Sequence, residues 1–277
     1  MNIGLIAGGG RFPLMFADAA KAADYRVYAA AYLNQAEPGI ENRVEMVRWL
    51  NIGEVERLID FFRQNRVTDI VIIGWIRKPG SMFSDIKPDA TALSLLAGLT
   101  DTHDDTLLRS FANLLESRGF VVRSSTFLLP DVLADEGCWT KRTPTASQWS
   151  DIEVGWRIAK EIGRLDIGQC VVVQKGSVLA VEAIEGTDAA ITRGGSLGGG
   201  DAVVVKVCKP NQDTRFDVPA VGLETVKTMH SVNAFTLAIE AGKAVVFEKD
   251  EMVSFADEHG ISIVALKDGA LPSGAEK

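Results

Sequence analysis

The chain opens on residues 2–13 (NIGLIAGGGRFP), an apolar run that leads directly into three glycines and then a proline. A second run, 69–74 (DIVIIG), is equally apolar and also ends on a glycine. Unbroken apolar runs of this length are typical of strands buried on both faces, as in parallel sheets covered by helices. A proline just after the first glycine turn suits the first turn of a helix. These two stretches therefore indicate an α/β domain.

Around these runs, strand-like and helix-like segments alternate through the first half of the chain. This alternation predicts a Rossmann-like parallel sheet with right-handed crossovers. We expect strands at 2–7, 26–32, 44–47, 69–74 and 120–123, and helices at 11–23, 53–65, 90–99 and 104–117.

The periodicity fades between residues 128 and 145, where prolines and a glycine appear, and we place a domain boundary there. The prediction is a Rossmann-like N-terminal domain at 1–134 and a mixed α/β catalytic domain at 135–277, with the active site in the cleft between them. The second domain should hold a helix at 150–162 capped by Ser150 or Asp151, a hairpin of 169–174 and 177–182 across Lys175-Gly176, a strand at 202–208, one long helix at 223–241, and a βαβ tail at 244–247, 251–258 and 261–266. Residues 194–200 (GGSLGGG) are predicted to form a surface loop, with a lid as the alternative.

The composition limits the classes of function. The chain has 277 residues and is 47% hydrophobic, which allows a large core and two domains. Its net charge of −8 argues against a nucleic-acid partner held by a basic surface, although a local basic pocket stays compatible with it. The three histidines are too few for a metal centre built from four or five imidazoles.

Cysteine usage and hydropathy bear on the cellular location. Cys138, Cys170 and Cys208 are odd in number and far apart, so we expect inert thiols in a reducing compartment. The first residues lack the basic region and the cleavage site of a signal peptide. No apolar stretch approaches the roughly 20 residues that a membrane helix needs. We therefore expect a cytoplasmic protein.

The glycine turn is the first candidate site. Glycines let backbone N–H groups approach a phosphate closely, and a helix N-terminus favours negative charge. The dinucleotide fingerprint is not met, because Pro13 replaces its third glycine and 30–32 (AAY) lacks its acidic residue. We expect Gly9, Gly10 and Arg11 to contact a nucleotide or phosphate but not a nicotinamide cofactor. A purely structural tight turn is the alternative.

The loop 74–79 (GWIRKP) is the second candidate, because ligands of open parallel sheets bind outside the carboxyl ends of the strands. Trp75 offers an aromatic face to a base or sugar, and Arg77 offers a cation to phosphate. A solvated basic loop is the alternative reading. Residues 101–105 (DTHDD) contain a D-x-H string of the kind that dinuclear metallophosphoesterases use, but their further histidine strings are missing from the sequence. A helix cap by Asp104 or Asp105 is therefore the expectation there, and a contact to substrate or partner is the alternative.

Three polar strings adjoin the predicted strands of the second domain: 166–169 (DIGQ), 180–188 (AVEAIEGTD) and 206–219 (KVCKPNQDTRFDVP). Loops that leave buried strands converge on one edge of a sheet, so their side chains should lie close together. Carboxylates suit Mg²⁺, and cations offset the charge of a phosphoryl group in transit. A structural ion-pair network is the alternative. The charged members are Glu182, Glu185, Asp188, Lys206, Lys209, Asp213, Arg215 and Asp217.

On these strings, together with Ile6-Ala7-Gly8, Pro13 and Gly222, the sequence resembles the LpxI-type UDP-2,3-diacylglucosamine pyrophosphatases over essentially its whole length. This resemblance implies a hydrolase of lipid A biosynthesis in a Gram-negative bacterium. Its reaction would be the Mg²⁺-dependent cleavage of the pyrophosphate bond of UDP-2,3-diacylglucosamine into UMP and 2,3-diacylglucosamine 1-phosphate (lipid X), with water attacking the sugar-side phosphorus. Two domains would clamp the acylated UDP-sugar in their cleft.

The resemblance also implies roles for individual residues. The essential aspartate of the family matches Asp217, which we expect to bind Mg²⁺ or to orient the attacking water. We expect Asp188 and Asp213 to be further metal ligands or to hydrogen-bond the groups that bind the metal. An ordinary aspartate is a poor base at neutral pH but a good metal ligand, which favours the metal role. From their charge, we expect Lys206 and Arg215 to act with Asp217 in catalysis by neutralising phosphate oxygens. The predicted substrate-binding residues are Gly9, Gly10, Arg11, Trp75, Arg77, Gln169, Thr187, Asp188 and Gln212.

One alternative function belongs to a different class, a non-catalytic nucleotide-sugar or lipid-binding protein that uses the same cleft. A lipid substrate also suggests a transient, peripheral contact with the inner-membrane surface, although the net charge of −8 opposes attraction to anionic lipid. A homodimer is a further hypothesis.

Overall fold

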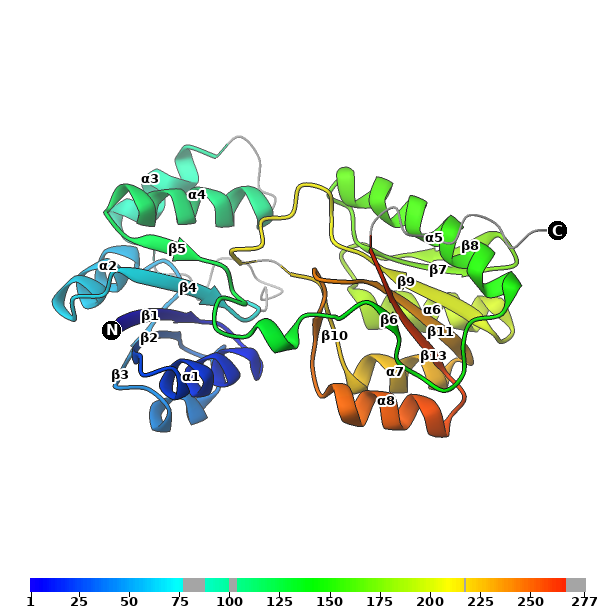
Figure 1. The fold of residues 1–277 in the computed structure, drawn as a ribbon. Helices are drawn as coiled ribbons and strands as arrows, with labels where there is room; N and C mark the ends of the chain where they lie inside the picture. The colour runs from blue at the N-terminus through cyan, green and yellow to red at the C-terminus, as the bar shows by residue number, and fades with distance from the viewer. Residues whose placement is uncertain (77–87, 100–103, 217, 268–277) are drawn as a thin grey trace. The chain divides into compact units, whose positions relative to one another are not determined.

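The computed structural model describes residues 1–76, 88–99, 104–216 and 218–267. Its contacts divide the chain into two compact units (Figure 1). The N-terminal unit comprises Met1–Pro130 and a short insertion that begins at Asp213, and the C-terminal unit comprises Asp131–Gln212 and the chain from Val218 onward. The predicted boundary after residue 134 places every later residue in the second domain. The insertion differs from that assignment, because its contacts lie within the N-terminal unit.

The N-terminal unit is built on a parallel sheet, and its described strands follow the order β3-β2-β1-β4-β5. The apolar faces of the strands are covered on one side by α1 and on the other by α2 and α4. This doubly wound arrangement confirms the predicted fold class. The strands are β1 Asn2–Ala7, β2 Arg26–Tyr32, β3 Met46–Leu50, β4 Asp69–Ile73 and β5 Val121–Arg123, and the helices are α1 Phe12–Ala22, α2 Val55–Gln64, α3 Ala90–Ala97, α4 Asp104–Ser117 and the 3₁₀ turn Pro38–Asn42.

The strand order reverses between β1 and β4, which are neighbours in the sheet but separated by β2 and β3 in the chain. The glycine turn follows β1 and Trp75 follows β4, so both leave the sheet at this reversal. In open α/β sheets this is the point where ligands bind. The fold therefore places the glycine turn beside Gly74 and Trp75, the described start of the second candidate loop, as the sequence predicted.

The C-terminal unit is built on a mixed sheet, and its described strands follow the order β6-β13-β11-β9-β7-β8. Strands β9, β11 and β13 are parallel, whereas β6 and β7 run antiparallel to their neighbours. Helix α5 covers one face, and α6, α7 and α8 cover the other (Figure 1). The elements are the 3₁₀ turn Pro130–Val132, β6 Gly137–Cys138, α5 Ala146–Arg164, β7 Cys170–Gln174, β8 Ser177–Val181, α6 Thr187–Gly198, β9 Ala202–Lys206, β10 Ala220–Val221, α7 Leu223–Ser231, β11 Ala234–Glu240, β12 Val245–Val246, α8 Lys249–Glu258 and β13 Ser262–Leu266.

The predicted long helix at 223–241 is wrong. Helix α7 ends at Ser231, and Asn233 then takes a left-handed conformation with φ of 55°, which no helix continues through. The apolar run Ala234–Glu240 forms the central strand β11 instead. A run buried on both faces has no period that distinguishes a strand from a helix, so the sequence pattern predicts one helix across both elements. The predicted βαβ tail is also altered, because β12 pairs with β10 and the parallel unit is β11, α8 and β13.

The glycine-rich stretch at 194–200 is not a loop or a lid, because most of it belongs to helix α6. Gly194 and Gly195 are buried, and each is needed for close packing. A Cβ on Gly194 would lie 2.6 Å from the Cβ of Val172, and a Cβ on Gly195 would lie 2.3 Å from Cγ2 of Val232. These glycines therefore let α6 approach the sheet and α7, and they do not serve flexibility.

Helix α5 begins earlier than predicted, with Thr145 and not Ser150 or Asp151 as its cap. Thr145 and Gln148 form a capping box, in which each side chain bonds the backbone N–H of the other. Asp151 is buried, and its carboxylate accepts the N–H groups of Lys175 (2.9 Å) and Gly176 (2.6 Å). The predicted hairpin across these two residues is thereby confirmed, and Asp151 fixes its turn.

Candidate functional site

In the N-terminal unit, the glycine turn after β1 packs tightly against the turn after β4. The N–H of Gly8 donates to the carbonyl of Ile73 (2.8 Å), and the N–H of Gly9 donates to the carbonyl of Trp75 (2.7 Å). A Cβ on Gly9 would lie 2.7 Å from the Trp75 indole. Two of the three glycines, Gly8 and Gly9, therefore donate their N–H groups to carbonyls of the protein, and a larger residue at position 9 would collide with the indole.

Trp75 is half exposed, and its ring lies against Gly9 and Gly10. Gly10 adopts a φ of 89°, which a glycine tolerates without strain, and the exposed Arg11 follows it as the N-cap of α1. The arrangement supports the structural-turn alternative for this motif. Contact of Gly9, Gly10, Arg11 and Trp75 with a nucleotide stays a prediction, and Arg77 lies outside the described residues.

In the C-terminal unit, the polar strings meet at one edge of the sheet. Strand β7 begins where its antiparallel neighbours β8 and β9 end, so Gln169, Glu182 and Lys206 are brought together. The Glu182 carboxylate accepts the N–H of Gln169 (3.2 Å) and the hydroxyl of Thr187 (2.7 Å). Gly168 is tightly enclosed, because a Cβ there would lie 2.1 Å from the Glu182 carbonyl oxygen. Glu182 is therefore a structural tie between two of the strings.

Lys206 is the last residue of β9 and is only 7% exposed. Its Nζ donates to the carbonyl oxygen of Ala220 (2.7 Å) and makes no ion pair with any carboxylate in the part of the chain that the structure describes. Cys170 lies opposite Lys206 in the register. Burial raises the pKa of the Cys170 thiol to about 12, and the negative charges of Glu182 and the exposed Asp188 raise it as well. The positive charge of Lys206 acts in the opposite direction and lowers this pKa. Four predicted site residues therefore share this edge, namely Gln169, Thr187, Asp188 and Lys206.

The other charged residues of the strings in this unit are paired. Lys209 Nζ contacts Asp166 (2.6 Å), and Arg193 contacts Glu185 (2.5 Å). The Oε1 of Gln212 accepts the N–H of Lys209 (2.8 Å). For these residues the ion-pair alternative describes the structure. Two buried amide atoms lack a hydrogen-bond partner among the described residues, namely Oε1 of Gln169 and Nε2 of Gln212.

Asp213 and Arg215 form a close pair within the N-terminal unit. The Arg215 guanidinium donates to both carboxylate oxygens of Asp213, with Nη2 at 2.7 Å, and its Nη1 donates to Glu116 of α4 (2.8 Å). The hydrogen bonds from Arg215 hold the pKa of Asp213 below its usual range. Both carboxylate oxygens of Asp213 thus accept hydrogen bonds from Arg215.

The described residues do not form a magnesium centre by themselves. Within them, no three His, Cys, Asp or Glu side chains gather in a way that could hold a metal ion. Of the three predicted ligands, Asp213 is engaged by Arg215, Asp188 is exposed in the first turn of α6, and Asp217 lies outside the described residues. His103 also lies outside them, while α4 begins at Asp104 as predicted. No described helix is both long and apolar enough to cross a membrane.

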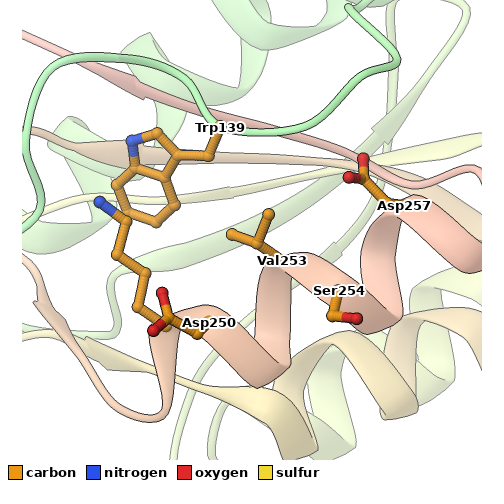
Figure 2. A pocket seen from close by; sticks show the side chains of 6 residues that line it. Trp139, Asp250, Val253, Ser254 and Asp257 are labelled. Atoms are coloured by element: carbon orange, nitrogen blue, oxygen red, sulfur yellow. The ribbon is translucent and has the colours of Figure 1, made fainter.

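A shallow groove of about 430 Å³ lies elsewhere in the C-terminal unit, along α8 (Figure 2). Lys249 places its ammonium over the Trp139 ring, 4.3 Å from the centroid, and also pairs with Asp135. None of the predicted site residues lines this groove. Its lining residues are Trp139, Lys249, Asp250, Val253, Ser254 and Asp257.

Comparison with known proteins identifies the family. Models of the LpxI N-terminal domain and the LpxI C-terminal domain match residues 2–132 and 135–264. The UDP-2,3-diacylglucosamine pyrophosphatase LpxI of Caulobacter vibrioides is 32% identical, over 96% of this chain and 97% of its own length. The chain belongs to the LpxI family. The resemblance inferred from the sequence strings is thereby confirmed.

Solved structures outside the LpxI family overlap only loosely with this chain. A phosphoribosylglycinamide synthetase from Anaerococcus prevotii is 11% identical with a TM-score of 0.28, covering 67% of this chain and 40% of that one. A glycinamide-RNase-transformylase T from Mycobacterium tuberculosis is 12% identical with a TM-score of 0.25, covering 66% of this chain and 44% of that one. The chain thus spans less than half the length of either.

Within this LpxI chain, sequence reasoning missed the partners of the insertion. Glu116 binds Arg215 from 99 positions away, and Ser124 and Ser125 both contact Thr214. Nothing local in the sequence signals these contacts, because Glu116 reads as one more polar position on a helix. The remaining clue is Phe216, a large apolar residue inside a polar string, which packs against the core of the N-terminal unit.

Proposed function

We propose that this protein hydrolyses the pyrophosphate bond of UDP-2,3-diacylglucosamine and releases UMP and lipid X. Two facts support the proposal: membership of the LpxI family and the named activity of its Caulobacter relative. The edge of the C-terminal sheet adds a third, because it supplies a cation suited to a phosphate oxygen. Cytoplasmic residence, a transient contact with the inner-membrane surface and a homodimer stay predictions.

The structural observation behind the proposal is the burial of the Lys206 ammonium without an ion pair in the described residues. A buried ammonium group loses much of its hydration, which costs several kcal/mol unless an opposite charge replaces the water. Its one hydrogen bond in the described residues goes to a neutral carbonyl, that of Ala220. A pyrophosphate oxygen would supply the missing negative charge. The ammonium would then stabilise the charge that builds up as the phosphoryl group is transferred.

The proposed reaction is a displacement at the sugar-side phosphorus. The oxygen of a water molecule forms a bond to that phosphorus, and the bond from the same phosphorus to the bridging oxygen breaks. The bridging oxygen leaves with UMP, and the proton that the water loses passes to solvent. We assign Asp217 to orienting this water, on the match of its string to the family. Mg²⁺ dependence belongs to the proposal on the same ground.

A timed assay on UDP-2,3-diacylglucosamine tests the function. With Mg²⁺ present we expect UMP and lipid X, no turnover in EDTA, and a loss of at least about a hundredfold in Asp217→Ala and Lys206→Met. Lys227→Met is the matched control, because Lys227 lies on α7 of the same unit and pairs with Glu224 (2.8 Å). In H₂¹⁸O the label should enter lipid X. Label in UMP would refute attack at the sugar-side phosphorus, and tight binding without turnover would establish the non-catalytic alternative.

A further inference from the structure

The insertion Asp213–Phe216 is held on the N-terminal unit by contacts of three kinds. The carbonyl of Thr214 accepts the hydroxyl of Ser124 (3.1 Å) and the N–H of Ser125 (3.4 Å), the latter residue being 1% exposed. The Phe216 side chain packs against the hydrophobic core on the α2 and α4 side of the sheet. The third contact is the ion pair between Arg215 and Glu116.

The guanidinium of Arg215 is shared between two carboxylates. Its Nε and Nη2 bind Asp213, its Nη1 binds Glu116, and the side chain is 26% exposed. Asp213 and Glu116 raise the pKa of Arg215, and the charge of Arg109 also helps to lower the pKa of Asp213. A cation that is already bound by two anions is a weak ligand for a third. Arg215 is therefore poorly suited to the phosphate role that the sequence suggested.

We propose that Arg215 and Glu116 are positioning residues, which fasten the insertion to the N-terminal unit. The chain continues from Phe216 directly into Asp217, the aspartate assigned to the attacking water. These contacts fix the position of Phe216, the residue that precedes Asp217, on the N-terminal unit. Arg215 and Glu116 take no part in the chemistry themselves. This inference rests on the proposed function for its effect on turnover, but the fastening itself can be measured separately.

The two roles for Arg215 predict opposite effects of Glu116→Gln. If Arg215 were a phosphate ligand, removing a competing carboxylate would free its guanidinium and lower KM or leave it unchanged, with kcat retained. If Arg215 fastens the insertion, the same change removes the negative charge of Glu116 and weakens its hydrogen bond to Arg215, and kcat should fall at least about tenfold while KM changes less than about threefold. Arg215→Lys separates the roles again, because it keeps the charge but loses the paired donors that hold Asp213.

Trypsin provides a readout that does not depend on activity, because it cleaves after Arg215. We expect native Glu116→Gln to release the fragment ending at Arg215 at least about tenfold faster than wild type, followed by mass spectrometry. Glu161→Gln is the matched control, since Glu161 pairs with Arg164 (2.9 Å) on the surface of α5, and both its cleavage rate and its kcat should equal wild type.

The outcomes decide between the roles. A Glu116→Gln variant with wild-type kcat and wild-type cleavage overturns the proposal, and so does an Arg215→Lys variant whose kcat is retained. Wild-type protein without any turnover defeats the proposed function, while the trypsin rates still decide whether the insertion is fastened. Faster cleavage with unchanged kcat would show a fastening that has no part in positioning, and would also overturn the proposal.

Discussion

The variant Lys206→Met removes a buried ammonium and leaves an unbranched side chain of similar length. The substitution changes the free energy of unfolding in two opposite ways. The variant loses one charge-assisted hydrogen bond to Ala220, which is about 1.5–3 kcal/mol. It also avoids the desolvation of a side chain that is 7% exposed, which is several kcal/mol. Because no ion pair in the described residues offsets that desolvation, we expect the free energy of unfolding to rise by about 1–2 kcal/mol.

Lys160→Met is the matched comparison and should have the opposite sign. Lys160 pairs with Glu240 at 2.7 Å, and the Glu240 side chain is 1% exposed. The variant removes the charge-assisted hydrogen bond from Lys160, while Lys243 still contacts the other oxygen of Glu240 (2.8 Å), so we expect a loss of about 1.5–3 kcal/mol. Urea unfolding followed by circular dichroism measures both changes. The same Lys206→Met protein should lose at least about a hundredfold in kcat/KM on UDP-2,3-diacylglucosamine.

The binding of inorganic pyrophosphate tests whether Lys206 binds an anion. If it does, pyrophosphate should raise the Tm of wild type and have a smaller effect on the Tm of Lys206→Met. A Lys206→Met protein that is destabilised as strongly as Lys160→Met and keeps its activity would contradict a role of Lys206 in anion binding. Lys206 would then be a structural residue whose hydrogen bond to Ala220 outweighs its desolvation.

Three further results follow from the packing and the charges. Gly195→Ala should lose about 1–3 kcal/mol in urea unfolding, because its Cβ would lie 2.3 Å from Val232, and an unchanged stability would contradict the close packing of α6. Arg215 lowers the pKa of Asp213, so the stability that wild type has over Asp213→Asn should be constant above about pH 5 and shrink as the pH falls below about 4. A stability difference that grows in acid would contradict a lowered pKa of Asp213. Burial raises the pKa of Cys170 to about 12, so iodoacetamide at pH 8 should not alkylate this thiol in the native protein, whereas it should alkylate the exposed Cys138.

Much of the N-terminal fold could be predicted because its signals are local. The run at 69–74 identifies β4, and the apolar stripe Val55, Leu58, Ile59 and Phe62 identifies α2, all of whose members are buried. A glycine turn between a strand and a helix is equally local. What the sequence could not reveal is the purpose of those glycines, since the indole of Trp75 comes from a different part of the chain.

The C-terminal unit was harder because glycine has two meanings. A cluster of glycines favours a loop when only conformational freedom is considered. In α6 the absence of a Cβ matters more, because Val172 and Val232 occupy the space that side chains would need. That information depends on which helix packs against which strand, so no local pattern contains it.

The candidate site shows the same limit for charges. Lys206, Lys209 and Arg215 look alike in sequence, each being a cation that follows or ends a strand in a polar string. In the structure Lys209 binds Asp166 and Arg215 binds Glu116, while Lys206 has no such partner among the described residues. A cation that already has a counter-ion gains little from a further anion, whereas a buried cation without a counter-ion lowers stability unless an anion binds to it. The three cations are therefore distinguished by their partners, which makes Lys206 the one whose replacement should lower activity and raise stability at once.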